Sequence, residues 1–170
     1  MTTPPGPQDA RWLSSAENLT WLRLSEVMIR LPAALDAQLT RDAGISFYEY
    51  MVLAMLSEQD DRTLGMGQLA RLTSGSLSRL SHVVKRLEKQ GYVRREASQH
   101  DRRHTNAILT DAGHDKIVAT APGHVDTVRH LVFDALSADQ ADSLREAATL
   151  IRHQIDPSDE WKLAPDSPTV

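Results

Sequence analysis

Apolar residues recur every three or four positions between residues 21 and 39, which is the spacing of one face of an α-helix. The stripe consists of Trp21, Leu24, Met28, Leu31, Leu35 and Leu39. It predicts a long helix from about residue 15 to residue 40. Pro32 lies within the stripe, and because proline removes a helical hydrogen bond, we expect a kink there.

Two capping boxes mark further helix starts. Each box consists of a serine and, three residues later, a glutamate or glutamine whose side chain can accept a hydrogen bond from the serine amide. The pairs are Ser46 with Glu49 and Ser137 with Gln140. The first box opens a helix whose apolar residues are Met51, Val52, Met55 and Leu56. The second opens the last helix, whose apolar stripe is Leu144, Ala148, Ile151 and Ile155.

A pair of helices joined by a tight turn is predicted between these boxes. The first spans about 66–73, and the second about 77–90, with Ser74-Gly75-Ser76 between them. The second helix buries Leu80, Val83, Val84 and Leu87. Its outer side carries Ser78, Arg79, Ser81, His82, Lys85 and Arg86. These lengths and this turn are typical of a helix-turn-helix.

A basic β-hairpin is predicted directly after this pair. Gly91 stands where a helix needs a left-handed terminal residue, and Tyr92-Val93 and Ala107-Ile108-Leu109 are short strand-forming runs. Between the runs lie Arg94, Arg95, His100, Arg102, Arg103 and His104. A helix-turn-helix followed by a basic hairpin is the layout of a winged helix-turn-helix, and it indicates duplex DNA as the partner.

The remaining sequence predicts helices that need a second copy of the chain. Thr110 is expected to cap a helix carrying Ile117, Val118, Val125, Val128, Leu131 and Val132, and Pro122-Gly123 should bend or break it. One copy offers little core for the stripes near the chain ends, so dimerisation would bury them.

The expected organisation is one domain, 10–156, between disordered tails at 1–9 and 157–170. Its DNA-binding lobe spans about 46–109, and its dimerisation helices span about 15–40 and 110–155. The fold class is therefore mainly α, with a small β-hairpin wing.

Composition narrows the class of protein. The chain has 170 residues, of which 41% are hydrophobic, as in ordinary globular domains. It has no cysteine, which excludes disulfides and thiolate metal sites. No apolar run is long enough to span a bilayer, and the first residues lack the pattern of a secretion signal, so we expect a cytoplasmic protein.

The charge is distributed unevenly along the chain. From Arg71 to His104 there are nine basic and three acidic residues, a formal charge of +6. Because the whole chain carries −4, the remainder carries −10. A basic segment on an acidic body is typical of a sequence-specific DNA-binding protein, although a solvated basic helix would show the same charge.

The candidate DNA-contacting residues lie in this segment. Residues near the start of a recognition helix reach base edges, which favours Ser76, Ser78, Arg79 and His82 as base readers. Lys85 and Arg86 lie further along the helix and should contact phosphate. In the hairpin, the candidates are Arg94, Arg95, Asp101, Arg102, Arg103 and His104.

These motifs resemble the MarR family of winged-helix regulators. The matching stretches are Leu69-Ala70, the turn and helix start from Ser74 to Arg79, and Val84 to Arg95. The family's wing signature, Asp-x-Arg followed by five residues and Leu-Thr, appears as Asp101-Arg102-Arg103 with Leu109-Thr110, and Ala112-Gly113 continues it. The chain departs from the family at Gly65-Met66-Gly67, where a polar cap near position 67 is common.

The resemblance implies a homodimer that binds a pseudo-palindromic operator in double-stranded DNA. It implies a repressor that a small aromatic or phenolic ligand releases. By position, Asp101 would stiffen the wing and Arg103 would enter or flank the minor groove, supported by Arg102 and His104. Minor grooves in A·T-rich DNA attract arginine because their potential is strongly negative.

A ligand site could be lined by methionine and aromatic side chains, which suit adaptable apolar pockets. The candidates are Trp21, Met28, Phe47, Tyr48, Met51 and Met55. The alternative is that they are ordinary core and dimer-interface residues.

Other functions have weaker support in the sequence. The histidines are poorly spaced for a metal site, and we expect them to be surface or DNA-facing residues, with no metal or other cofactor. No nucleophile elbow, phosphate loop or His-Glu-x-x-His motif occurs, so we expect no enzyme activity. The open alternatives are a winged-helix protein–protein adaptor without DNA binding, and a small-molecule enzyme or carrier.

Overall fold

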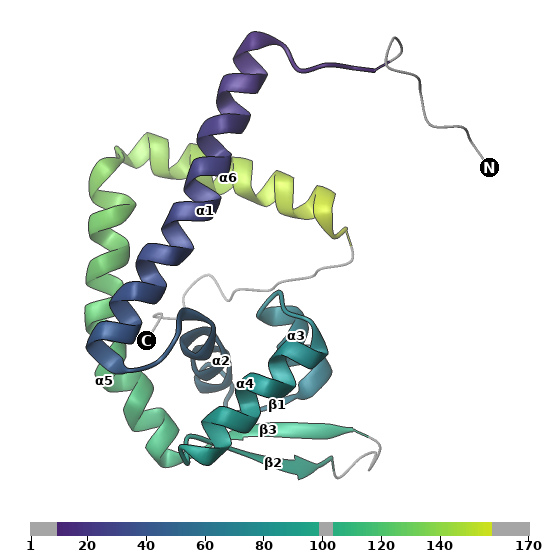
Figure 1. Ribbon diagram of the computed structural model, residues 1–170, viewed down its shortest axis with the longest axis vertical. Helices are drawn as coiled ribbons and strands as arrows, with labels where there is room; N and C mark the ends of the chain where they lie inside the picture. The colour runs from purple at the N-terminus through teal and green to yellow at the C-terminus, as the bar shows by residue number, and fades with distance from the viewer. Residues whose placement is uncertain (1–9, 99–103, 158–170) are drawn as a thin grey trace, which may run out of the picture. The chain divides into compact units, whose positions relative to one another are not determined.

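The computed structural model describes residues 10–98 and 104–157 (Figure 1). The chain divides into two compact units, residues 1–34 and 35–170. Both units share one helix, α1 (Ser15–Ala43). The described part of the first unit consists of residues 10–14 and the part of α1 up to Ala34. The long helix predicted from the apolar stripe is confirmed, and it extends three residues beyond the predicted end.

The second unit holds the remaining elements. Two helices, α2 (Phe47–Ser57) and α3 (Met66–Leu72), precede the longer helix α4 (Leu77–Lys89). The hairpin strands are β2 (Val93–Ala97) and β3 (Thr105–Leu109). The chain then forms α5 (Asp111–Leu131), the 3₁₀ turn η1 (Phe133–Ala135) and α6 (Ala138–Ile155).

A third strand, β1 (Thr63–Gly65), completes a small antiparallel sheet in the order β1-β3-β2. Leu64 pairs with Ala107 in one ladder, and Val93 pairs with Leu109 in the other. The sequence predicts no strand here, because three residues are too few to show a two-residue periodicity. The sheet anchors the base of the hairpin beside α4, as Figure 1 shows.

The core of the second unit joins the last part of α1, from Leu35, with α2, α3, α4, α5 and the sheet. Its fully buried side chains include Leu39, Leu53, Leu56, Leu69, Leu80, Val84, Leu87 and Ile117. The predicted inner face of α4 is confirmed, with Val83 partly buried against the same core. Because this face is fixed by packing, the opposite, polar face of α4 must point outward.

The predicted helix starts are confirmed in detail. Ser46 and Glu49 form a complete capping box, as do Ser137 and Gln140. Thr110 caps α5 by accepting a hydrogen bond from the Gly113 amide. By contrast, the N-cap of α3 is Gly65, which provides no side-chain hydrogen bond, as expected from the glycines in this segment.

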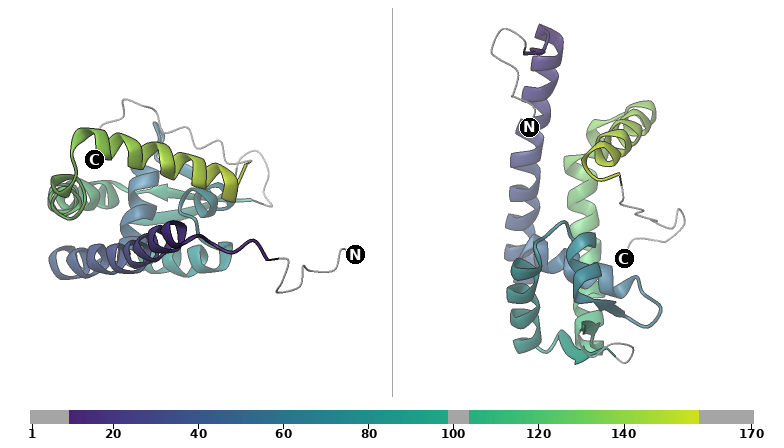
Figure 2. Two further views of the ribbon diagram at one scale, coloured as in Figure 1. Left: turned by 90° about the horizontal axis from the view of Figure 1, so that it is seen from above. Right: turned by 90° about the vertical axis from the view of Figure 1, so that its right-hand side faces the viewer.

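The sequence predicts a bend or a break at Pro122-Gly123, and the break does not occur. Figure 2 shows α5 as one continuous helix, and α1 also continues through Pro32. Both prolines lie on exposed sides of their helices. The carbonyl four residues earlier, which loses its helical donor, can therefore bond to water instead of remaining unsatisfied.

Several apolar side chains near the chain ends are exposed in the single chain. In the first unit these are Trp12, Leu13, Leu19, Trp21, Leu22, Val27, Met28 and Ile29. All of α6 is described, and none of its side chains is buried. Leu144, Leu150, Ile151 and Ile155 are its exposed apolar residues.

Candidate nucleic-acid interface

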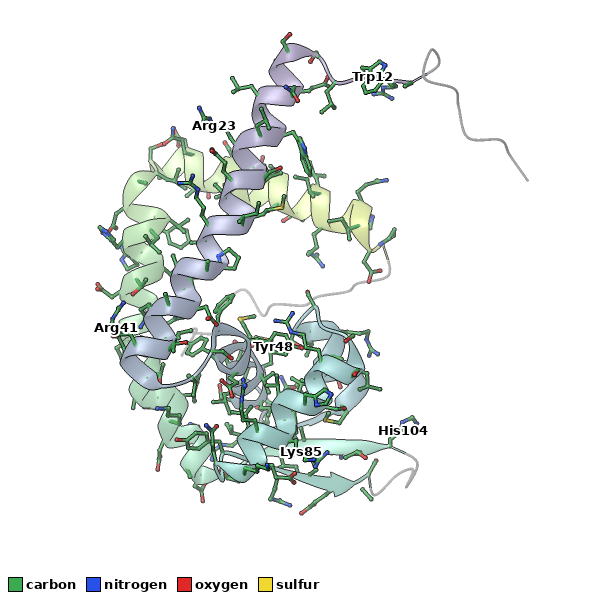
Figure 3. All side chains as sticks on the ribbon, in the orientation of Figure 1. Trp12, Arg23, Arg41, Tyr48, Lys85 and His104 are labelled. Atoms are coloured by element: carbon green, nitrogen blue, oxygen red, sulfur yellow. The ribbon has the colours of Figure 1, made fainter. Side chains whose placement is uncertain are left out.

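The outer face of α4 carries the residues expected to read DNA. Ser78, Arg79, His82 and Lys85 are all exposed, and they follow one another along the helix from its first turn. Lys85 is labelled on α4 in Figure 3. These side chains present hydroxyl, guanidinium, imidazole and ammonium groups, which suit base edges and phosphates.

Ser76 also has a local structural role. Its side chain caps α4 by accepting a hydrogen bond from the Arg79 amide at 3.2 Å. This contact uses the oxygen as an acceptor and leaves the hydroxyl proton available. The cap orients the first turn of α4, where the unpaired amides of a helix start favour an approaching phosphate.

Arg86 is held by a partner from another helix. Its Nε donates to Glu49 Oε1 at 2.5 Å, and the Glu49 side chain is 95% inaccessible to solvent. The other Glu49 oxygen accepts hydrogen bonds from the Ser46 amide at 2.7 Å and hydroxyl at 2.9 Å. Arg86 therefore connects α4 to the capped start of α2, in addition to any contact with phosphate.

The two arginines of β2 are also paired. Arg95 donates from Nη2 to Glu88 Oε2 at 2.7 Å, which ties the strand to the end of α4. The side-chain hydrogen bonds from Arg95, from Nη2 and from Nε, lower the pKa of the Glu88 carboxyl. Arg94 forms an ion pair with Glu96 on the same strand. Sequence reasoning did not find these pairings, because they depend on which side chains the fold brings together.

The tip of the hairpin is only partly described. His104, at the end of the described tip, is exposed, and its backbone carbonyl accepts a hydrogen bond from the Ser98 amide at 2.9 Å. Figure 3 labels His104 beside β3. Asp101, Arg102, Arg103 and His100 lie outside the described residues, as do the tail segments 1–9 and 158–170.

The residues suggested for a ligand pocket fall in both units. Trp21 and Met28 belong to the first unit, where their side chains are 52% and 51% exposed. Phe47, Tyr48 and Met51 are partly buried in the second unit, and Met55 is a core residue.

Tyr48 contacts the helix-turn-helix directly. Its hydroxyl lies 3.0 Å from Thr73 Oγ1, and the Arg79 guanidinium lies 4.2 Å from the centre of its ring. No feature of the local sequence around Tyr48 indicated these contacts.

The expectation that all histidines are surface or DNA-facing is wrong for His124. Its side chain is 8% exposed, and its ring lies 4.2 Å from the Tyr50 ring and 5.9 Å from the Phe47 ring. Its Nδ1 has no hydrogen-bond partner within the described chain. Burial lowers the pKa of this imidazole.

This burial makes stability depend on pH in a defined direction. Below about pH 6.5 the unfolded chain protonates this histidine while the folded protein still resists it, so stability decreases as pH falls. The His124→Gln protein should therefore lose less melting temperature than the unsubstituted protein between about pH 7.5 and 5.5. Thermal unfolding at one protein concentration measures this difference.

His130 provides the matched control, because it lies on the same helix and is exposed. The His130→Gln protein should follow the pH dependence of the unsubstituted protein. Equal pH dependence in the His124→Gln protein would contradict the role assigned to burial.

Two further features are absent from the described residues, a metal-binding cluster and a membrane-spanning helix. No group of three His, Asp or Glu side chains there could hold a metal ion. Within residues 10–98 and 104–157, no helix is long and apolar enough to cross a membrane.

Comparisons with known proteins agree with this geometry. Residues 43–104 match the model of the MarR family. Sco3205, a MarR family transcriptional regulator from Streptomyces coelicolor solved in complex with DNA, is 45% identical with a TM-score of 0.85. The similarity covers 88% of this chain and 93% of that one.

Two further proteins are similar to this chain. AbsC, a MarR family regulator from Streptomyces coelicolor, is 34% identical with a TM-score of 0.81, over 86% of this chain and 98% of that chain. The transcriptional repressor MprA of Escherichia coli is 26% identical over 113 residues, 66% of this chain and 64% of MprA. The match thus spans less than two thirds of that curated relative.

The fold and the exposed recognition helix define a winged-helix protein of the DNA-binding class. The chain belongs to the MarR family of transcriptional regulators.

Proposed function

We propose that this protein is a sequence-specific DNA-binding repressor that acts as a homodimer and is released from its operator by a small aromatic or phenolic ligand. The observation that carries the proposal is the polar outer face of α4, fixed by a packed inner face and followed by a basic hairpin. Ser76, Ser78, Arg79 and His82 would read bases. Lys85 would contact phosphate.

The three paired arginines refine this assignment. Arg86, Arg94 and Arg95 each have a carboxylate partner, so their contribution to phosphate binding is partly neutralised. In the hairpin tip, we retain Asp101 as a stiffening residue and Arg103 as the minor-groove contact, with Arg102 and His104 beside them. This part of the proposal rests on the wing signature in the sequence.

The proposed homodimer is supported by exposed apolar side chains. Both the first unit and α6 carry such residues, and exposed apolar surface of this extent often marks an interface. A two-fold dimer would place its recognition helices about 34 Å apart, in successive major grooves. The operator would then be a pseudo-palindrome.

DNA binding should weaken steeply as salt rises. Arg71, Lys85 and Lys89 are exposed cations in the basic segment. If each contacts phosphate in both subunits, the slope of log Kd against log salt should be on the order of 5. Titrating a fluorescent duplex operator at several salt concentrations measures the slope.

The matched variant for this titration is Lys85→Ala. Losing one phosphate contact per subunit should reduce the slope by about 1 for each subunit, with little change in base preference. A nearly flat salt response in the unsubstituted protein would contradict DNA binding by this face, and would favour a protein–protein adaptor.

The effector is proposed to bind beside α2 and α5. Phe47 and Tyr50 lie against His124 there, and two buried polar atoms, Gln38 Oε1 and His124 Nδ1, have no partner within the described chain. Buried polar atoms are normally hydrogen-bonded, so a polar aromatic molecule could satisfy them.

A panel of aromatic acids and phenols tests this part of the proposal. At least one compound should raise the melting temperature and release DNA. A panel in which no compound does either would overturn the ligand-released model, while leaving DNA binding intact.

A further inference from the structure

The phenol of Tyr48 contacts three consecutive parts of the helix-turn-helix. Tyr48 lies in the first turn of α2, next to the capping box that fixes the start of this helix. Its hydroxyl lies 3.0 Å from Oγ1 of Thr73, the C-cap residue of α3. Its ring faces the guanidinium of Arg79 at 4.2 Å. Figure 3 labels Tyr48 beside the helix-turn-helix.

The direction of the hydrogen bond follows from the other contacts of Thr73. Its Oγ1 donates its proton to the Leu69 carbonyl at 2.8 Å. A threonine hydroxyl has one proton, so both contacts of Thr73 are satisfied together when the Tyr48 hydroxyl is the donor to Thr73. The phenol therefore holds the end of α3 by a bond that phenylalanine could not make.

The turn between α3 and α4 is shaped to admit this phenol. A Cβ added at Gly75 would overlap the Tyr48 hydroxyl and lie 2.8 Å from Cζ. The φ angle of Gly75 is not in the left-handed region, so a glycine is needed here for space. Ser74, before it, has a φ of 50°. The tyrosine thus occupies the volume that a side chain at position 75 would take.

Arg79 is placed by its own helix and by this ring. Its amide bonds to the capping Ser76 at 3.2 Å, and its guanidinium rests on the face of Tyr48. An arginine side chain has many rotamers in solution, and ordering them opposes binding. A cation resting on an aromatic face is ordered before DNA arrives.

We propose that Tyr48 is a specificity-determining positioning residue, which holds the Arg79 guanidinium and the turn in the arrangement that reads one base pair. The inference rests on the proposed function, in which Arg79 meets a base edge. It assigns to α2 a part in sequence recognition, although Tyr48 itself need not contact DNA.

The test compares variants on a set of duplexes in which each base pair of the selected operator is changed in turn. Arg79→Ala identifies the base pair that Arg79 reads. Tyr48→Leu should then lose discrimination at that same base pair, by about three- to tenfold. The Tyr48→Leu/Arg79→Ala protein should discriminate no worse there than Arg79→Ala alone.

Conservative and matched variants separate positioning from stability. Tyr48→Phe keeps the ring, so it should retain most of the discrimination while its melting temperature falls. Tyr92→Leu removes a partly buried tyrosine that packs against the same core, and it should lower the melting temperature without changing the discrimination profile.

Gly75→Ala gives a second approach that does not depend on Tyr48→Leu folding. The added methyl group would displace the phenol, so discrimination should fall at the same base pair. Adding Tyr48→Phe to Gly75→Ala removes the overlapping hydroxyl and should restore part of the melting temperature.

The outcomes distinguish failure of the role of Tyr48 from failure of the proposed DNA-binding function. Discrimination unchanged in both Tyr48→Leu and Gly75→Ala, or additive losses from Tyr48→Leu and Arg79→Ala, would overturn the role of Tyr48 alone. An Arg79→Ala protein with unaltered base preference would overturn the role of Tyr48 and also the assignment of Arg79 as a base reader. If the unsubstituted protein shows no base preference at all, the proposed function fails and this inference fails with it.

Discussion

Replacing Gly113 with alanine is expected to destabilise the fold by about 3 kcal/mol, since overpacking at a rigid contact has effects of this size. For a protein of this length, that corresponds to a fall of roughly 6–12 °C in melting temperature. An added Cβ would overlap the Tyr92 carbonyl oxygen and lie 2.7 Å from Leu109 Cδ1. One obstacle is backbone, so it cannot rotate away.

The position matters because it joins the winged-helix part to α5. The same Tyr92 carbonyl accepts a hydrogen bond from the Thr110 amide at 3.0 Å, and the Thr110 hydroxyl donates to the Gly91 carbonyl at 2.7 Å. Moving α5 away from Tyr92 would strain these bonds. Gly113→Ala is therefore expected to lower the free energy of unfolding. It should also change the orientation of α5 relative to the hairpin strands.

Gly123→Ala is the matched control, because it lies on the same helix. Among residues 10–98 and 104–157, its Cβ would meet only Gln38 Nε2, at an ordinary 3.9 Å. Alanine favours a helix over glycine by about 0.5–1 kcal/mol, so this variant should melt at the same temperature or slightly higher. Equal losses in the two variants would contradict the close contact at Gly113.

Replacing Arg79 with alanine is expected to weaken binding to the selected operator by about 1–3 kcal/mol, and to relax the preference at one base pair in each half-site. Arg79 is exposed in the first turn of α4, where residues of a recognition helix reach base edges. Competition titrations with operator and altered duplexes measure both effects.

The control for Arg79 is Lys85→Ala, on the same face of α4. It should weaken all duplexes by a similar factor, because a phosphate contact carries no direct base information. Arg86→Ala should behave differently from both. It leaves the buried Glu49 carboxylate without its ion pair, so its main effect should be a lower melting temperature. If Arg79→Ala weakened every duplex equally, its role as a base reader would be contradicted.

Local sequence patterns predicted most helices and the recognition face of α4. Capping boxes at Ser46 and Ser137 are local signals, because both partners lie within one turn. The inner face of α4 follows from a 3.6-residue period that reports burial directly. The hairpin was predicted because Gly91 and two short apolar runs occur close together in sequence.

Interactions between distant residues could not be predicted in this way. The contact of Arg86 with Glu49 spans 37 positions, and that of Tyr48 with Thr73 spans 25. Each depends on how helices pack, which no single stretch of sequence reports. The sequence therefore predicted the candidate site only from the types of its residues. The structure adds that three of its arginines form ion pairs with carboxylates of the same chain.

His124 illustrates the same limit for burial. A histidine beside Pro122 and Gly123 gives no periodic signal of an inward face, yet it lies against Tyr50. The predicted break at Pro122-Gly123 was wrong in the opposite sense, because Pro122 lies on an exposed side of α5, where a carbonyl without a helical donor can be hydrated and need not end the helix. Both the environment of His124 and the effect of Pro122 depend on whether the residue is buried, which is a property of the folded chain.

Selection of bound fragments from a pool of random duplex DNA tests the central claim most directly. At about 0.15 M salt, where non-specific binding is weak, the protein should enrich one pseudo-palindrome. Its half-sites should lie about one helical turn apart, because each dimer would place two copies of α4 in successive major grooves. Recovery of fragments with no shared sequence, or of a single half-site without a partner, would contradict the account.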